Sequence, residues 1–224
     1  MRRATRPELE ELPLEVAPRL LGAELRTVVD DLEVRLRITE VEAYHGQGTG
    51  DVPDPGSHAR MGRTARNETM WGEPGHLYVY LSHGIHSCVN VVCGPQGTAG
   101  GVLLRAGSVT FGADAAASRT GSSSRAGRSG RDLARGPGRL GQVSGLRHPV
   151  HDGIDFVTGT PLHGARAELW WGSEVVDVAS GPRVGVAGIA GTDAFPWRFW
   201  IEGDPTVSPF RWGRGAADAQ AMLD

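Results

Sequence analysis

The chain has 224 residues, of which 39% are hydrophobic and 22% charged, and its formal net charge is −3 at pH 7. Length and composition are those of one globular domain, and they exclude a coiled coil or a wholly disordered chain. The sequence has no run of about eighteen apolar residues and no apolar signal segment, so we expect a cytoplasmic protein with no membrane partner.

A short helix is the first predicted element. Residues 12–21 favour a helix that begins at Pro13. The segments at 1–11 and 213–224 are expected to fray, as chain ends commonly do. Between them the sequence predicts one domain and no internal repeat.

The next segment predicts a hairpin whose second strand carries two carboxylates. Residues 24–29 and 32–44 flank a polar two-residue turn, and the second run alternates between apolar and polar residues. The face of this strand that begins with apolar side chains continues, at every second residue, through Glu40, Glu42 and Tyr44. An ionised carboxylate beside apolar surface is costly without a partner or a task, so both glutamates are candidate catalytic residues. The alternative is that the strand end turns outward and both are solvated.

Flat side chains gather in the segments that follow. The chain continues with a loop at 45–57, an arginine-bearing stretch at 58–67, and strands at 77–81, 88–93 and 102–105. Tyr44, His58, Tyr80 and His83 fall near the ends of these strands and in the loops, where they could enclose a planar ligand. Core packing explains any one of them equally well, but less easily all four.

Positive charge is concentrated in the middle of the chain. Eight arginines against Asp114 and Asp132 give residues 105–147 a charge of +6, which leaves −9 for the rest. Within this region, 118–131 is a low-complexity segment that we expect to form a mobile loop. Arg139 directly follows a Gly-Pro-Gly run that is typical of a helix start. The N-terminus of this helix, together with the arginine, could hold a phosphate. All 23 basic residues are arginine, so no lysine is available to form a Schiff base.

Metal and cofactor sites are not expected. Cys88 and Cys93 are too few for a disulfide framework or a four-cysteine zinc site, and we interpret them as buried thiols. His83 and His86 have a spacing seen in metal ligands, but no further ligand motif accompanies them. We therefore predict no metal and no cofactor.

These patterns together predict a strand-rich α+β domain with long surface loops. Specific motifs occur in the order EVEAYHG at 40–46, SHARMGRTARN at 57–67, GHLYVYLSHGIHSCVNVVCG at 75–94, VLLRAG at 102–107, LARGPGRL at 133–140, then PRVGV and PWRFW. They resemble the alkyladenine (3-methyladenine) DNA glycosylase family over nearly the whole chain. The resemblance implies one α+β domain around a curved, mainly antiparallel β-sheet with surrounding helices. It also implies an enzyme that flips alkylated or deaminated purines out of duplex DNA and hydrolyses their N-glycosidic bond.

The resemblance assigns the catalytic residues. Glu42 matches the family's catalytic glutamate, which activates water and stabilises positive charge on the sugar, and Arg105 matches the arginine that supports it. Because the chain has no lysine, we expect a monofunctional enzyme that leaves an intact abasic strand. The partner implied is damaged double-stranded DNA, bound by a monomer that is nucleoid-associated if the source is bacterial.

The resemblance also assigns the DNA-binding residues. Tyr44 matches the tyrosine stacked on the flipped base, while His58 and Tyr80 match residues on its other side. Asn90 matches the asparagine that crowds the 2-amino group of guanine. His83 stands where the family usually has an intercalating tyrosine, so the wedge here is smaller. Arg139 is the expected contact to the DNA backbone.

Two other functions remain open from sequence. One is a catalytically inactive DNA-damage binder on the same scaffold. The other is a carboxylate-pair sugar hydrolase, which requires Glu40 and Glu42 to face one substrate about 5 to 10 Å apart.

Overall fold

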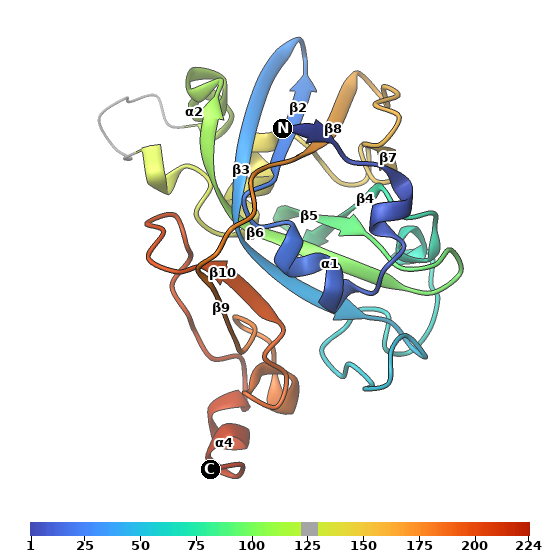
Figure 1. Cartoon of the computed structure of the whole chain (residues 1–224), viewed down its shortest axis with the longest axis vertical. Helices are drawn as coiled ribbons and strands as arrows, with labels where there is room; N and C mark the ends of the chain where they lie inside the picture. Colours follow the sequence, from blue (N-terminus) through green and yellow to red (C-terminus); the bar gives the residue numbers. More distant parts are fainter. Residues whose placement is uncertain (122–129) are drawn as a thin grey trace.

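The alternating segments of the sequence pair into one curved antiparallel sheet (Figure 1), as seen in the computed structural model, which describes residues 1–121 and 130–224. The strands are β1 (Arg2–Arg3), β2 (Glu24–Val29), β3 (Leu32–His45), β4 (His76–Ser82), β5 (His86–Val92), β6 (Gly100–Phe111), β7 (Ile154–Asp155), β8 (Ala165–Trp171), β9 (Val178–Gly181) and β10 (Arg198–Ile201). The α-helices are α1 (Pro13–Arg19), α2 (Ala113–Arg119), α3 (Pro137–Ser144) and α4 (Ala216–Ala221). Short 3-10 helices are η1 (Arg6–Leu9), η2 (Glu68–Trp71), η3 (Gly130–Asp132) and η4 (Gly188–Gly191). The predicted α+β class with a curved antiparallel sheet is confirmed.

Strand β3 is the centre of the sheet. The strand order is β1-β8-β2-β3-β6-β5-β4-β7, and the β9–β10 ribbon joins at β3. One edge of β3 pairs with β6 along most of its 14 residues. The other edge pairs first with β2 and then with β10, so β3 changes partner along its length. Glu40 and Glu42 lie in the second part, opposite Trp200 and Arg198 of β10.

The uninterrupted alternation predicted for residues 32–44 is wrong. The register between β3 and β6 shifts between Ile38 and Glu40 and again between Glu40 and Val41. Such bulges bend a strand and re-aim its side chains. Beyond the bulge Val41 belongs to the hydrophobic core, so Glu40 and Glu42 point to the opposite face of the strand.

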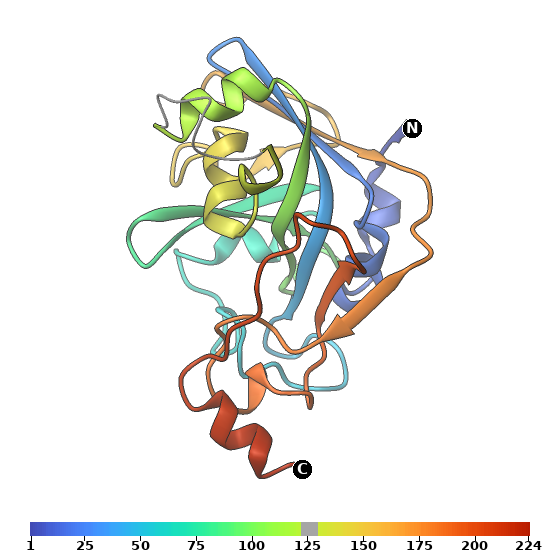
Figure 2. The same ribbon diagram turned by 90° about the vertical axis from the view of Figure 1, so that its left-hand side faces the viewer.

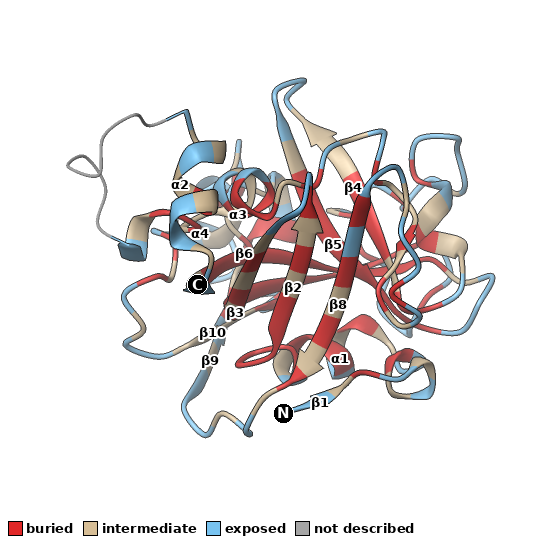
Figure 3. Ribbon diagram, turned by 90° about the horizontal axis from the view of Figure 1, so that it is seen from above, coloured by how far each residue is buried: buried red, intermediate tan, exposed pale blue. Residues whose placement is uncertain are grey.

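The curved sheet encloses an apolar core (Figure 3). Strand β3, which carries both glutamates, contributes side chains to this core. Leu25, Leu36 and Leu104, one from each of β2, β3 and β6, are fully buried. Helix α3 packs on β5 and β6, and Figure 2 shows α2 and α3 together on this side of the sheet. A buried leucine contributes roughly 1.5–3 kcal/mol, so the platform under the glutamates is firmly fixed.

The N-terminal residues are ordered, contrary to the fraying predicted for 1–11. Strand β1 pairs with β8, and Leu9 is wholly buried in the core. Glu8 accepts a hydrogen bond from Trp171 Nε1 at 3.0 Å. Local polarity suggested a free end, but the long-range partner on β8 was not visible in the local sequence.

The C-terminal residues also differ from the prediction for 213–224. They include α4, whose Ala216 is fully buried. Gln220 accepts a hydrogen bond from the Asp193 amide at 2.8 Å, which ties α4 to the segment after η4.

The loop predicted at 118–131 begins later than expected. Arg119 is the last residue of α2, and it donates hydrogen bonds to the carbonyls of Val143 at 2.8 Å and Leu32 at 2.8 Å. Arg131 lies in η3. Residues 122–129, which carry the rest of this prediction, lie outside the described residues. In the described ranges, no helix combines the length and apolar character needed to cross a membrane.

Candidate active site

A cavity of about 470 Å³ opens over strands β3, β4, β5 and β6. Its lining includes seven residues singled out from the sequence: Glu42, Tyr44, His58, Tyr80, His83, Asn90 and Arg105. Loop residues 184–187 form another part of its wall. The folded chain therefore brings together groups that are far apart in the sequence, such as Glu42 and Val184, which are 142 positions apart. Arg139 is exposed on α3, close to the lining residue Pro137 but not part of the lining.

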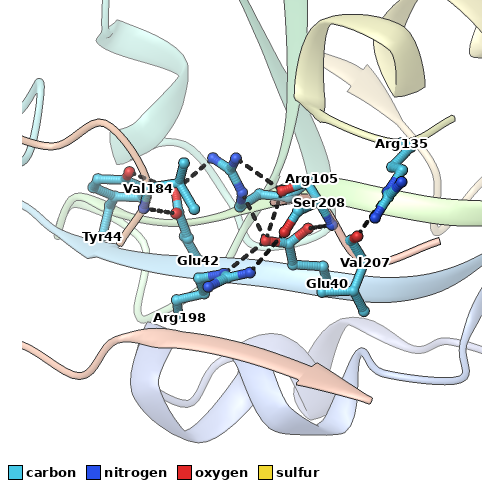
Figure 4. Close-up of polar contacts among 9 residues, drawn as sticks. All are labelled: Glu40, Glu42, Tyr44, Arg105, Arg135, Val184, Arg198, Val207 and Ser208. Carbon is cyan, nitrogen blue, oxygen red and sulfur yellow. Dashed lines mark hydrogen bonds and ion pairs between the residues drawn. The ribbon is translucent and has the colours of Figure 1, made fainter. Parts of the chain in front are cut away.

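Glu42 is a fully buried carboxylate at the floor of this cavity (Figure 4). Its Oε1 accepts the backbone N–H of Val184 at 2.7 Å. Its Oε2 accepts the Tyr44 hydroxyl at 2.8 Å and the Arg105 Nη1 at 3.3 Å. Among the described residues these three donors hold the carboxylate. An ionised carboxylate has about four acceptor sites, so one site remains for a molecule in the cavity.

Glu40 is equally buried but does not line the cavity. Its Oε1 accepts Arg198 Nε at 2.7 Å, Arg105 Nε at 3.1 Å and the Ser208 hydroxyl at 3.0 Å, and its Oε2 accepts the Ser208 amide at 2.8 Å. These four donors, counted over the described part of the chain, match the capacity of a carboxylate. Glu40 and Glu42 thus do not face one substrate, which argues against the carboxylate-pair sugar hydrolase.

Arg105 connects the two carboxylates. It comes from β6, is 6% exposed, and reaches Glu40 through Nε and Glu42 through Nη1. Burial alone lowers the pKa of Arg105, but the charges of Glu42 and Glu40 outweigh it and raise the pKa overall. The guanidinium therefore stays charged and fixes the position of both side chains.

Tyr44 is supported from behind by a buried ion pair that the sequence analysis did not identify. Arg183 is wholly buried, its guanidinium carbon lies 4.5 Å from the centre of the Tyr44 ring, and it forms a bidentate pair with Asp54 at 2.7 and 2.8 Å. Burial and the Glu42 charge raise the pKa of Tyr44 well above its usual value. The phenol therefore keeps its proton and donates a hydrogen bond to Glu42. Arg183 lies in the PRVGV motif, the one sequence signal that could have revealed it.

Another part of the cavity lining is aromatic. The His58 and Tyr80 rings meet edge to face, with centroids 4.7 Å apart and planes at 83°. Tyr80 also stacks with Tyr78 at 5.5 Å. Partial burial lowers the pKa of His58, and the charges of Arg66 and Arg60 lower it further, so its imidazole is neutral at pH 7.

Asn90 and His83 occupy two further edges of the cavity. Asn90 is buried, and its Nδ2 donates to the Tyr78 carbonyl at 3.0 Å, which fixes the side chain. His83 lies at the tip of the β4–β5 hairpin with φ of 50°, a left-handed conformation that is uncommon for a residue other than glycine. Beside it Ile85 is 72% exposed. The tip therefore presents an imidazole and an apolar side chain to solvent.

The backbone N–H of Val184 is the other group that sequence analysis missed. It makes the shortest of the hydrogen bonds that reach Glu42 from the described residues, at 2.7 Å. A main-chain donor is present at every non-proline position, so no residue type signals it.

Comparisons with known proteins found one matching family model and many similar chains. A family model described as methylpurine-DNA glycosylase (MPG) matches residues 8–205. A relative from Leifsonia xyli subsp. xyli named "Putative 3-methyladenine DNA glycosylase" is 49% identical over 203 residues, covering 88% of each chain. Proteins of the same name are 46% identical in Streptomyces avermitilis, over 88% of this chain and 87% of the relative, and 44% identical in Mycobacterium tuberculosis, over 94% and 98%.

Proposed function

The chain belongs to the methylpurine-DNA glycosylase family, and from this premise we propose that it is a monofunctional DNA glycosylase that hydrolyses the N-glycosidic bond of damaged purines and leaves an abasic site. The observation that carries the proposal is the incompletely satisfied hydrogen bonding of Glu42. This carboxylate is held by three donors at the floor of an aromatic-walled cavity, with an acceptor site left over.

The cavity suits a single planar base. Tyr44, His58 and Tyr80 all line it, and the His58 and Tyr80 rings contact each other. A base within a duplex cannot reach a cavity floored by a buried carboxylate, so the nucleotide must be rotated out of the stack. Damaged bases pair weakly and cost least to extrude, which supplies part of the selectivity.

Glu42 is proposed as the general base. A water bound to its free acceptor site attacks C1′ of the sugar as the C1′–N bond to the purine breaks, and Glu42 takes the proton of that water. The bond electrons leave with the base, and the carboxylate stabilises the positive charge that develops on the sugar. Arg105 and the Val184 amide hold the carboxylate in this position before the substrate arrives.

The cavity residues also suggest a preference among lesions. A purine alkylated at a ring nitrogen is cationic and leaves without further protonation, and the faces of Tyr44 and Tyr80 attract such a cation. Asn90, fixed by the Tyr78 carbonyl, would crowd the 2-amino group of guanine and favour adenine adducts. His58 is neutral at pH 7, so deaminated, uncharged bases lack a strong proton donor from this residue.

The exposed hairpin tip and Arg139 are proposed to contact the DNA around the lesion. His83 lies beside the cavity at the end of a stiff hairpin, where it can fill the gap left by the flipped nucleotide. Arg139 is exposed near the same opening and can pair with a phosphate. We propose that the protein acts as a monomer, because one chain supplies every group in this proposal. Its proposed location is that of the DNA.

Monofunctional chemistry follows from the available nucleophiles. Strand cleavage by a glycosylase commonly uses an amine that forms an imine with C1′, and this sequence contains no lysine. Water is therefore the proposed nucleophile.

Duplexes carrying 3-methyladenine, 7-methylguanine, hypoxanthine or ethenoadenine test the proposal. We expect release of free base from the alkylated substrates, strand breaks only after alkali, and no protein–DNA adduct when borohydride is added during turnover. A trapped covalent complex would refute the monofunctional reaction. Tight binding of lesion DNA without base release would support the inactive damage binder instead.

A further inference from the structure

The segment 206–216, here called the C-terminal strap, lies beyond the residues matched by the family model. It leaves the end of β10, crosses the sheet beside β3 and leads into α4 (Figure 2). Along this path it contacts the cluster around Arg105 and the loop that carries Val184, and both of these hold Glu42. None of its residues was a candidate site residue in the sequence.

The first half of the strap joins the cluster around Arg105. The Ser208 amide and hydroxyl both donate to Glu40, at 2.8 and 3.0 Å, and the Ser208 hydroxyl also accepts Arg105 Nη2 at 3.2 Å (Figure 4). The Val207 carbonyl accepts Arg135 Nε at 2.9 Å. These contacts fix the guanidinium of Arg105, whose other nitrogen reaches Glu42.

The second half of the strap supports the wall loop, residues 184–188. The carbonyls of Arg211 and Arg214 accept the amides of Gly185 and Gly188 at 2.9 and 3.0 Å. The wall loop lines the cavity, and its Val184 amide donates to Glu42 at 2.7 Å. The strap thus stands directly behind the backbone that orients the carboxylate.

Gly213 packs against the wall loop without space for a side chain. A Cβ atom at Gly213 would lie 2.1 Å from the Val186 carbonyl oxygen and 2.7 Å from the Gly185 carbonyl carbon. From another side, a Cβ at Gly191 would lie 2.0 Å from the same Val186 oxygen. The peptide of Val186 is therefore held between two glycines, and it cannot move without moving its neighbours.

We propose that the C-terminal strap is a positioning element of the active site, with Gly213 and Ser208 as its positioning residues. It acts on the reaction through the Val184 amide and Arg105, which together hold Glu42. The inference rests on the proposed function, because it concerns the same carboxylate. It assigns a catalytic requirement to a segment beyond the family-matched residues.

Gly213→Ala tests the inference, because its methyl group must displace the wall loop. We expect single-turnover excision of 3-methyladenine to fall by roughly tenfold or more, since small misplacements of a catalytic group are costly. Affinity for a duplex carrying a tetrahydrofuran abasic analogue should stay within about twofold, because that ligand is neutral and makes no ion pair with Glu42.

A second readout separates positioning from general damage to the fold. A duplex with a pyrrolidine abasic analogue carries a positive charge near C1′ and pairs with Glu42 in the wild-type protein. Gly213→Ala should lower the ratio of pyrrolidine to tetrahydrofuran affinity by about tenfold, whereas a folding defect lowers both affinities equally. Ser208→Ala, which keeps the backbone contact to Glu40, should lower the same ratio by a smaller factor.

Trp212→Ala is the matched control. Trp212 precedes Gly213 in the strap and is 43% exposed, and its ring packs edge to face on Phe210, with centroids 4.8 Å apart, so its removal leaves the backbone contacts of Arg211 and Arg214 to the wall loop in place. We expect wild-type excision and an unchanged affinity ratio. If Trp212→Ala weakens both analogues while Gly213→Ala excises normally, the strap is a DNA contact and the inference is wrong. If the wild-type protein releases no base at all, the proposed function fails first.

Discussion

Glu40 and Glu42 lie two residues apart on the same strand and are equally buried, yet their surroundings differ. Four donors from the described residues surround Glu40, two of them arginine side chains, and Glu40 has no access to the cavity. Glu42 has three donors in the same part of the chain and lines the cavity. The comparison teaches that burial alone does not identify a catalytic carboxylate. What separates Glu42 from Glu40 is a free acceptor site that faces the cavity.

The two surroundings are joined by one guanidinium. Arg105 contacts both carboxylates, so the cluster around Glu40 also anchors Glu42. Removing one partner from a buried ion pair leaves the other charge uncompensated, which is strongly destabilising. Variants at the two glutamates should therefore separate stability from activity.

Glu42→Gln should give the largest change. The amide keeps the size of the side chain but cannot accept a proton, so we expect excision to fall by about a hundredfold or more. Binding of lesion DNA should change little, and the free energy of unfolding should fall less than in Glu40→Gln, because among the described residues Glu42 pairs with one arginine and Glu40 with two. Single-turnover kinetics and a fluorescence-anisotropy titration measure excision and binding. Wild-type excision by this variant would remove Glu42 from the mechanism.

Glu40→Gln should have the opposite profile. It weakens the bonds to Arg105 and Arg198, and the free energy of unfolding should fall by about 2 kcal/mol, in the range for hydrogen bonds to charged groups. Excision per folded molecule should fall by less than about tenfold, because Glu42 and its main-chain donor remain. Urea unfolding followed by active-site titration tests this. Equal losses of excision for both glutamate variants would revive the carboxylate-pair mechanism.

Substitutions at His83 should change the affinity for DNA without changing the stability of the fold, unlike substitutions at the two buried glutamates. His83→Tyr provides a larger ring to stack in the DNA gap, and His83→Ala provides none. Stacking on a base contributes about 1–3 kcal/mol. Affinity for lesion DNA should therefore rise roughly tenfold in His83→Tyr and fall roughly tenfold in His83→Ala. Unfolding midpoints should match the wild type, since the side chain is exposed. Unchanged affinities in both variants would assign the gap to Ile85 or another residue.

Arg139→Ser should give the smallest effect, because a single phosphate contact is involved. The slope of log affinity against log salt should become shallower by about one, with no change in lesion preference. Arg166→Ser is the charge-matched control, since Arg166 is exposed on β8, away from the cavity lining. Identical slopes for the two variants would place Arg139 outside the DNA contact.

Local sequence patterns determined much of the fold. Alternating and continuous apolar runs identified β2 at Glu24–Val29 and the start and end of β3, because side chains in a strand repeat every two residues. The proline at Pro13 marked the start of α1. The polar end segments were misinterpreted, because the burial of Leu9 depends on partners elsewhere in the chain.

The motifs also determined which side chains form the site. Glu42, Tyr44, His58, Tyr80 and Asn90 were identified from residue type, motif and resemblance, and the fold gathers them around one cavity. Such side chains have recognisable chemistry, so the sequence reveals them without coordinates.

The resemblance already singled out Glu42 over Glu40, but only the tertiary structure supplies the physical difference between them. The register shifts beyond Ile38, the donors that saturate Glu40 and the Val184 amide that orients Glu42 all depend on pairing between distant segments. A bulge arises from the register of two strands, and a main-chain donor has no side chain to identify it. The sequence thus determined which groups are available for chemistry. The three-dimensional contacts decided which one keeps a free acceptor site, because hydrogen-bond saturation is a property of the assembled neighbourhood and not of the residue.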